Sequence, residues 1–222
     1  MKMKTGIIIG ALTLLLVSGQ VHAAPYTFYT ISNSNPVDVA IGESQLFMEV
    51  IDLGFDIDLN LNQLQFYFTN TGPQQSTITR IFFDDTDPRS LQFVGQETGF
   101  TTVGTVKFTQ ATNLQPAFPN GNSIGFVVDD RYDANNPGPQ DGINIGEALG
   151  ITFNLLGDAT YNSIISSLSD GTLRVGLHVT NFASKGSESF VNSPNPIPEP
   201  TTLLLFGSGL LGLAGLGRRK RS

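Results

Sequence analysis

Carboxylates and one histidine are the residues of this chain whose types and spacing could do chemistry. Paired carboxylates catalyse glycoside hydrolysis when they lie about 5 to 10 Å apart, and carboxylates with loop carbonyl groups bind Ca²⁺. The acidic groups are Asp84, Asp85 and Asp87, then Asp129, Asp130 and Asp133, and the pair Asp56 and Asp58. Neither large group has the D-x-[DN]-x-[DN]-G spacing with a distal Glu that marks a calcium-binding loop. Solvated loop acids are therefore the simplest interpretation.

The second large group is the better candidate for calcium, because a long polar loop over residues 131–142 brings a further carboxylate with it. If the chain binds Ca²⁺, we expect the ligands to be Asp129, Asp130, Asp133 and Asp141. The first group has a simpler explanation, since its acids end a strand-forming run and precede a Thr-Asp-Pro turn. The sequence predicts no other cofactor.

His178 would have to act as the base of any Ser-His-Asp hydrolase in the exported part of the chain. It falls in the middle of an alternating run, on the polar side, where we expect an exposed strand residue. That part of the chain lacks a G-x-S-x-G nucleophile elbow, and the absence of cysteine excludes thiol chemistry and thiolate metal sites. We therefore expect no enzymatic activity, with a secreted hydrolase as the less favoured alternative.

The part of the chain between the two ends is strongly acidic. Residues 24–200 contain all 19 acidic side chains and six of the basic ones, which gives a formal charge of −13 against −7 for the whole chain. A surface of this charge repels nucleic acid and anionic membranes. We therefore expect no nucleic-acid partner.

The N-terminus has the pattern of a secretory signal peptide. Lys2 and Lys4 precede an apolar stretch over residues 7–17, and residues 21–23 have the small-residue spacing that signal peptidase cleaves. We expect cleavage after Ala23. The expected signal helix is therefore residues 1–23, and the remainder of the chain is expected to be exported.

The C-terminus combines a short polar motif, an uncharged apolar stretch over residues 201–217 and a basic cluster. As a helix the apolar stretch would be roughly 25 Å long, the lower end of what crosses a bilayer core of about 30 Å. The positive-inside rule keeps the basic cluster in the cytoplasm, where it acts as a stop-transfer signal. The polar motif is Pro198, Glu199 and Pro200, and the basic cluster is Arg218, Arg219, Lys220 and Arg221.

Several runs between the two ends alternate apolar and polar residues with the period of two that marks a strand with one buried face. The clearest of these runs are residues 64–69, 151–155 and 173–180. The runs expected to lie more centrally, because they are apolar on both faces, are residues 45–51 and 77–83. Shorter strand candidates are residues 91–94, 105–109, 123–128 and 187–192.

One segment is periodic like a helix, because Tyr161, Ile164, Ile165 and Leu168 recur on one helical face and Gly171 follows. Strands about every ten residues without alternating helices predict an all-β fold. We expect an antiparallel β-sandwich, Ig-like or jelly-roll, with one short helix, besides the signal helix and a C-terminal transmembrane helix. The expected domains are a signal peptide (1–23), the β-sandwich ectodomain (24–192), a proline-rich linker (193–200), the transmembrane helix (201–217) and a basic cytoplasmic tail (218–222).

The order of features in the last 25 residues resembles the PEP-CTERM sorting signal of Gram-negative bacteria. Proteins with that signal are exported substrates of an exosortase, a membrane protease-transpeptidase. The resemblance implies recognition at Pro198, Glu199 and Pro200, a transient inner-membrane anchor, loss of the tail, and delivery to the cell surface or a biofilm exopolysaccharide matrix. The segments that resemble a recurrent PEP-CTERM ectodomain without assigned activity are 70–72, 146–153, 171–179 and 186–192.

Two alternatives to a non-enzymatic envelope or matrix protein remain open besides the hydrolase. One is a polysaccharide-binding module, although the chain has no tryptophan and only Tyr67 and Tyr132 are expected to expose an aromatic ring within the domain. The other is a calcium-dependent, adhesin-like protein that uses the acidic loop.

Overall fold

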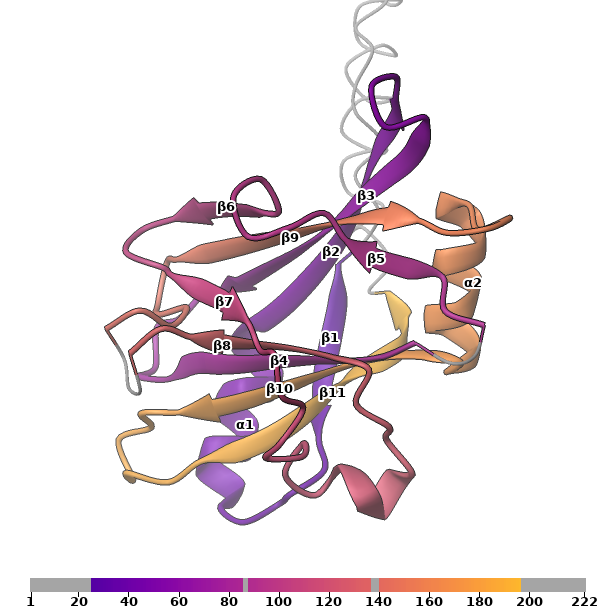
Figure 1. The fold of residues 1–222 in the computed structure, drawn as a ribbon. Coiled ribbons are helices and arrows are strands. Elements are labelled where there is room, and N and C mark those ends of the chain that lie inside the picture. The colour runs from indigo at the N-terminus through magenta and orange to yellow at the C-terminus, as the bar shows by residue number, and fades with distance from the viewer. Residues whose placement is uncertain (1–24, 86–87, 137–139, 197–222) are drawn as a thin grey trace, which may run out of the picture.

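The described strands form one antiparallel sheet that curls around an aromatic core. The computed structural model describes residues 25–85, 88–136 and 140–196 (Figure 1). The expected signal helix and transmembrane helix lie outside these residues, and within them no helix is long and apolar enough to cross a bilayer. The strands are β1 Tyr26–Thr30, β2 Leu46–Asp56, β3 Leu61–Asn70, β4 Thr77–Asp85, β5 Leu91–Phe93, β6 Phe100–Val103, β7 Phe108–Gln110, β8 Asp130–Ala134, β9 Ala148–Leu155, β10 Leu173–Thr180 and β11 Glu188–Pro196.

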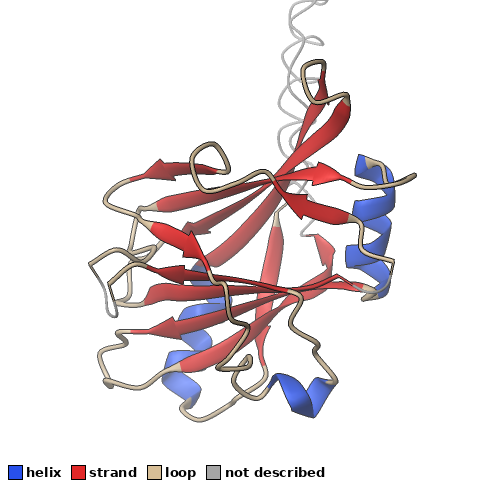
Figure 2. Ribbon diagram, in the orientation of Figure 1, coloured by secondary structure: helices blue, strands red, loops and turns tan. Residues whose placement is uncertain are grey.

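The strand order in the described residues is β5-β9-β3-β2-β1-β11-β10-β4-β8-β7, and β6 also pairs with β9. Figure 2 shows that the sheet bends so that its two halves face each other. The predicted antiparallel all-β class is confirmed, but the two separate sheets of a sandwich are not observed. The reason is β1, which pairs with β2 on one side and β11 on the other and so joins the halves.

Aromatic rings fill the space between the two halves of the sheet. Phe66 from β3, Phe83 from β4 and Phe153 from β9 are fully buried, and the Phe66 and Phe153 ring centroids each lie 5.0 Å from that of Phe83. Tyr132 from β8 joins them with its ring centroid 5.8 Å from Phe83. These edge-on and tilted contacts are the geometry that aromatic pairs prefer.

The three runs with clear alternation are strands, but the expected single buried face is wrong for β9, which is buried on both faces. Leu64, Phe66 and Phe68 are fully buried in β3, and β10 begins and ends as predicted at residues 173 and 180. β11 extends to Pro196 and so includes the first four residues of the expected linker.

Four strand assignments need correction. Residues 123–128 are not a strand: the first two end η1, a 3₁₀ helix over Gly121–Ile124, and the others follow it. Phe126 of this segment packs with Phe118 against Phe82 and Val191, in a small apolar cluster separate from the main core. Residues 131–142 do not form one long loop, because β8 occupies the first part, and Tyr132 is buried rather than exposed. β1 and β6 were not predicted.

The predicted short helix is present as α2, Tyr161–Asp170. Its own residues Ile164 and Leu168 are buried on the face that packs against the core. Thr160 caps its N-terminus through a reciprocal capping box with Ser163, and Gly171 ends it in the left-handed conformation that favours glycine. Local capping and an apolar stripe thus both specify this helix.

A second helix, α1 over Pro36–Gln45, corrects the expectation of a single one. Its buried residues are Asp38, Gly42 and Gln45, so it has no apolar stripe for a periodicity argument to find. The Gln45 amide group donates to Asn70 Oδ1 at 3.1 Å and to Ser76 Oγ at 2.6 Å. α1 is therefore held against the sheet by polar contacts, which compensate for the burial of these groups.

Candidate functional site

The two ends of the described domain lie side by side on neighbouring strands. Tyr26, near the start of β1, pairs with Pro196 at the end of β11 and with Met48 of β2. The chain therefore enters and leaves the domain at the same place. The predicted sorting residues Pro198, Glu199 and Pro200 follow directly, but they lie outside the described residues, as do Arg218, Arg219, Lys220 and Arg221.

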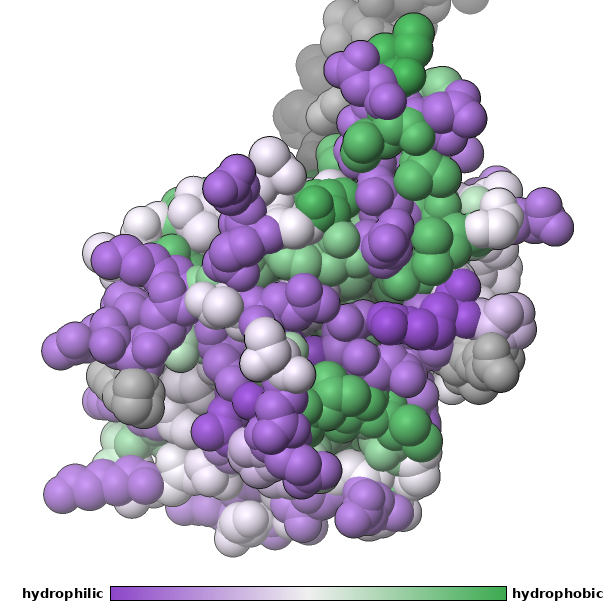
Figure 3. All heavy atoms as spheres, viewed as in Figure 1, coloured by the Kyte–Doolittle hydropathy of each residue, from purple (hydrophilic) through white to green (hydrophobic). Residues whose placement is uncertain are grey.

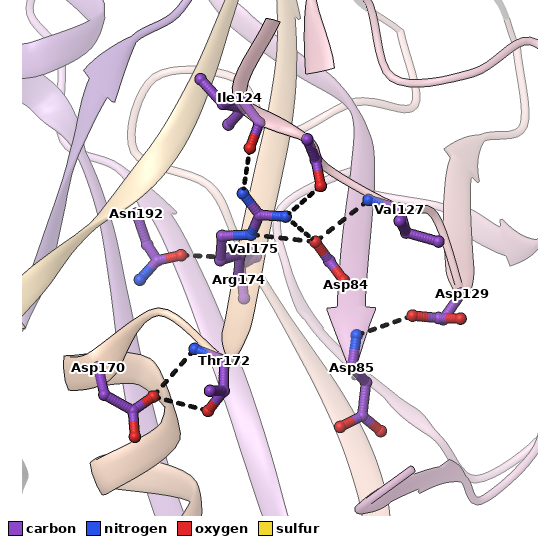
Figure 4. Close-up of polar contacts among 11 residues, drawn as sticks. Asp84, Asp85, Ile124, Val127, Asp129, Asp170, Thr172, Arg174, Val175 and Asn192 are labelled. Carbon is purple, nitrogen blue, oxygen red and sulfur yellow. Dashed lines mark hydrogen bonds and ion pairs between the residues drawn. The ribbon is translucent and has the colours of Figure 1, made fainter. Parts of the chain in front are cut away.

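Asp84, at the end of β4, forms a buried ion pair with Arg174 of β10 (Figure 4). The carboxylate also accepts a hydrogen bond of 3.1 Å from the Val127 amide. The guanidinium donates to the carbonyl oxygens of Ile124 at 2.7 Å and Gly125 at 2.6 Å. This pair therefore fixes the loop after η1 onto the sheet, which is a structural role for an acid considered as a catalytic candidate.

Asp85, the last residue of β4, is equally engaged in local structure. Its carboxylate accepts hydrogen bonds of 2.9 Å from the amides of Ser90 and Leu91 and one of 2.6 Å from the Ser90 hydroxyl. Its own amide donates to Asp129 Oδ2 at 2.9 Å. Asp85 thus closes the turn between β4 and β5, as the turn interpretation predicts, while Asp87 lies outside the described residues.

Asp129 and Asp130 lie against β4, so the structure brings together parts of the two acidic groups that the sequence separates. Burial raises the pKa of Asp129 above its ordinary value, although the hydrogen bond from the Asp85 amide opposes the rise. Burial likewise raises the pKa of Asp130, opposed by the nearby Arg89. Asp130 is ion-paired with Arg89 and accepts from the Gln110 amide group at 3.0 Å.

The four expected calcium ligands are not brought together. Asp133 Oδ2 pairs with the Arg131 guanidinium at 2.8 Å, and Asp141 accepts a hydrogen bond of 2.6 Å from Asn136. Asp129 and Asp130 have the separate partners given above. Among the residues that the structure describes, no group of three or more acidic or histidine side chains has an arrangement that could hold a metal ion.

His178 is partly buried in a polar hollow of about 310 Å³ rather than exposed on a wet strand face. The hollow is lined by Thr79, Arg80, Asp133, Ala134, Asn136, His178 and Thr180. His178 Nδ1 and Asp133 Oδ1 are buried and make no hydrogen bond within the described protein. No serine lines the hollow, so the structure does not assemble the Ser-His-Asp geometry there.

Burial of the ring, together with the charge of Arg80, lowers the pKa of His178 to about 4. A histidine in the unfolded chain binds its proton near pH 6.5, so the unfolded state binds more protons between these two values. The stability contributed by neutral His178 is therefore fully present above about pH 6.5 and is lost as the pH falls toward 4.

We expect wild-type protein to lose about 1 to 2 kcal/mol of unfolding free energy relative to His178→Gln between pH 6.5 and 4, after allowing for the part of the ring that water reaches. Urea unfolding of both proteins across this range measures the difference. Asp129 and Asp130 titrate in wild type and variant alike, so their contribution cancels in the difference between the two unfolding free energies. A difference that does not vary with pH would contradict a neutral, buried ring.

A protein-family model described as the PEP-CTERM protein-sorting motif matches residues 196–221. No curated protein and no solved structure matches the chain. The match begins at the last residue of β11 and includes the proline-flanked glutamate, the apolar stretch and the basic cluster. The motif implies export to the cell envelope with an exosortase as the processing partner. The resemblance noted for the last 25 residues is confirmed: the chain carries a PEP-CTERM sorting motif, which follows directly on a β-domain.

Proposed function

We propose that this protein is a non-enzymatic component of the cell envelope or of the exopolysaccharide matrix of a Gram-negative bacterium. In this proposal signal peptidase removes residues 1–23. Residues 201–217 then anchor the exported domain in the inner membrane until an exosortase recognises the motif and removes the tail. Glu199 is the recognised acid, and Arg218, Arg219, Lys220 and Arg221 stop the chain on the cytoplasmic side.

The observation that carries this proposal is the position of the motif relative to the fold. The family match begins at Pro196, which is still paired with Tyr26 in the sheet. Four residues, 197–200, separate that pair from the start of the apolar stretch. A sorting motif placed immediately outside a folded domain is accessible to a membrane enzyme without any unfolding of the domain.

The contacts of the acidic residues support a structural rather than catalytic use. Asp84 and Asp130 are each paired with an arginine, and Asp85 binds three groups of its own turn. A glycosidase pair needs one carboxyl group free to donate a proton and one free to attack or activate water. Substituting any of these acids should therefore change stability rather than a reaction rate.

The sorting proposal is tested by replacing Glu199 in the full chain and following the protein by cell fractionation. We expect wild-type protein in the surface or matrix fraction and Glu199→Ala in the inner membrane with its tail intact. Glu97→Ala, which replaces an exposed acid in the domain, is the matched control and should behave as wild type. Delivery of Glu199→Ala to the surface with wild-type efficiency would refute recognition of this residue.

The hollow around His178 favours one second function, contact with a polysaccharide. All but one of its lining residues have polar side chains, and Arg80, Asn136 and Thr180 offer hydrogen-bonding groups to an incoming hydroxyl group. Retention of the purified protein on the polysaccharide of its own host's matrix tests this function. His178→Ala should reduce retention, whereas Asn162→Ala on the exposed side of α2 should not. Equal retention of the two variants would exclude the hollow as the binding site.

A further inference from the structure

The hairpin between β2 and β3 extends beyond the rest of the sheet. β1 pairs with β2 only as far as Met48, and β9 pairs with β3 only as far as Gln63. Residues 52–62 therefore have no strand neighbours except each other, and we call this segment the arm. Figure 1 shows it rising clear of the body of the domain.

The arm exposes large apolar side chains to solvent. The exposed fractions are 48% for Leu53, 58% for Phe55, 83% for Ile57 and 51% for Leu59. Figure 3 shows apolar surface gathered along the arm, between polar residues. Single exposed apolar residues are ordinary, but four within seven positions of one projecting element indicate a binding surface.

The tip of the arm is a hydrogen-bonded turn. Asp56 Oδ1 accepts hydrogen bonds from the amides of Asp58 at 2.9 Å and Leu59 at 3.1 Å. Asn60 has a φ of 57°, a left-handed conformation that asparagine tolerates better than most residues. Lower in the arm, Asp52 accepts from the Gly54 amide at 2.9 Å. The apolar side chains are thus presented on a preformed support.

The arm points the same way as the chain that leaves the domain. β11 and β2 are both antiparallel to β1 and so run in the same direction, and Tyr26 sets Met48 level with Pro196. At about 3.3 Å per residue the tip at Ile57 lies roughly 30 Å beyond that level along β2. A twist of about 20 to 25° per strand reduces the projection along β11 to roughly 20 Å.

The linker is shorter than the arm. Five steps of at most about 3.6 Å separate Pro196 from Thr201, so the apolar stretch begins no more than about 18 Å from the end of β11. If residues 201–217 lie in a bilayer and β11 points toward it, the membrane surface is therefore no farther from the domain than roughly the tip of the arm. The short linker therefore makes the bilayer surface the partner that the exposed apolar side chains of the arm contact.

We propose that the arm inserts its apolar tip into the outer surface of the membrane while the precursor is anchored. This inference rests on the proposed anchoring of residues 201–217. Phe55 and Ile57 enter the boundary between headgroups and acyl chains, and Asp56 and Asp58 remain among the headgroups. The second contact restricts the domain's tilt and so holds Glu199 at the membrane surface, where a membrane enzyme acts. Once the tail is removed, the arm alone is too small to keep the protein on the bilayer.

The absence of tryptophan from the chain makes the test direct. Ile57→Trp in the full chain is reconstituted into phosphatidylcholine vesicles whose acyl chains carry bromine, which quenches only tryptophan in contact with it. The matched control is Val37→Trp, because Val37 is 67% exposed in α1, which precedes β2 at its opposite end. Leu210→Trp, within residues 201–217, reports on the anchor itself.

We expect bromine to quench Ile57→Trp and Leu210→Trp but not Val37→Trp. Quenching of Leu210→Trp alone would overturn the arm's role and leave the anchor intact, whereas no quenching of Leu210→Trp would overturn both. Emission from Ile57→Trp that is shielded from water without bromine quenching would show that a second copy covers the arm, and this also refutes the inference. Replacing part of the lipid with anionic phosphatidylglycerol should weaken the quenching of Ile57→Trp, because the arm carries three carboxylates.

Discussion

Truncation of Phe83 to alanine is expected to lower the free energy of unfolding by about 3 to 5 kcal/mol. The ring is fully buried, and the ring centroids of Phe66, Phe153 and Tyr132 lie within 5.8 Å of its own. These neighbours come from β3, β9 and β8, so Phe83 joins both halves of the curled sheet. Removing it leaves a cavity that rigid strands on two sides cannot collapse to fill.

Urea unfolding of Phe83→Ala measures this loss, and Phe55→Ala is the matched control. Phe55 is 58% exposed on the arm, so its truncation should change stability by less than about 0.5 kcal/mol. Equal effects of the two substitutions would mean that the two halves of the sheet do not share a core around Phe83.

Replacement of Asp84 by alanine is expected to cost about 3 kcal/mol, because it leaves the Arg174 guanidinium without its counter-charge at a largely buried position. Arg174→Met removes the charge and keeps much of the apolar volume, so the double variant should be less destabilised than the two single losses added together. The expected coupling is about 1 to 3 kcal/mol. Urea unfolding of the single and double variants gives the complete cycle.

Hydrogen exchange separates a local from a global role of Asp84. The Val127 amide donates to Asp84, so its protection should fall more in Asp84→Ala than that of amides in β3. Asp158→Ala, a substitution of an exposed acid, should leave the exchange of the Val127 amide and of the β3 amides unchanged. Additive effects in the cycle, together with unchanged exchange at Val127, would contradict the buried pair.

The strands predicted from the sequence are those in which period-two alternation coincides with one buried face. In β3 and β10, apolar residues at every second position face the core, so elementary burial determines the element. α2 was predictable for the same reason, since it has both an apolar stripe and local caps. Where the apolar pattern and the burial agree, a single sequence is sufficient to predict the element.

Two of the elements that the sequence did not reveal, α1 and β8, depend on polar contacts. α1 buries Asp38, Gly42 and Gln45, which no apolar periodicity can reveal, although the Asn35-Pro36 start signal was present. β8 lies in an acidic segment whose charges are compensated by its own Arg131 and by Arg80 and Arg89 from elsewhere in the chain. β1 is short, and its importance comes from joining β2 to β11, a relation that local sequence does not contain.

The arginine partners of the acids were the missed signal at the candidate sites. Between residues 24 and 200 only six basic residues face 19 acidic ones, so each cation was a candidate partner for a buried carboxylate. Four of the six form ion pairs with aspartates in the described residues: Arg80, Arg89, Arg131 and Arg174. Considering the acids without these cations led to the interpretation that they are solvated loop acids, whereas Asp84, Asp85 and Asp130 are buried.

The intact mass of the protein recovered from the cell surface or matrix tests the central claim most directly. The account predicts a chain that begins after Ala23 and ends at the sorting motif, without the uncharged stretch and the basic cluster. A surface form whose mass still includes Arg218, Arg219, Lys220 and Arg221 would contradict it, because a tail that remains attached has not been processed at Pro198, Glu199 and Pro200.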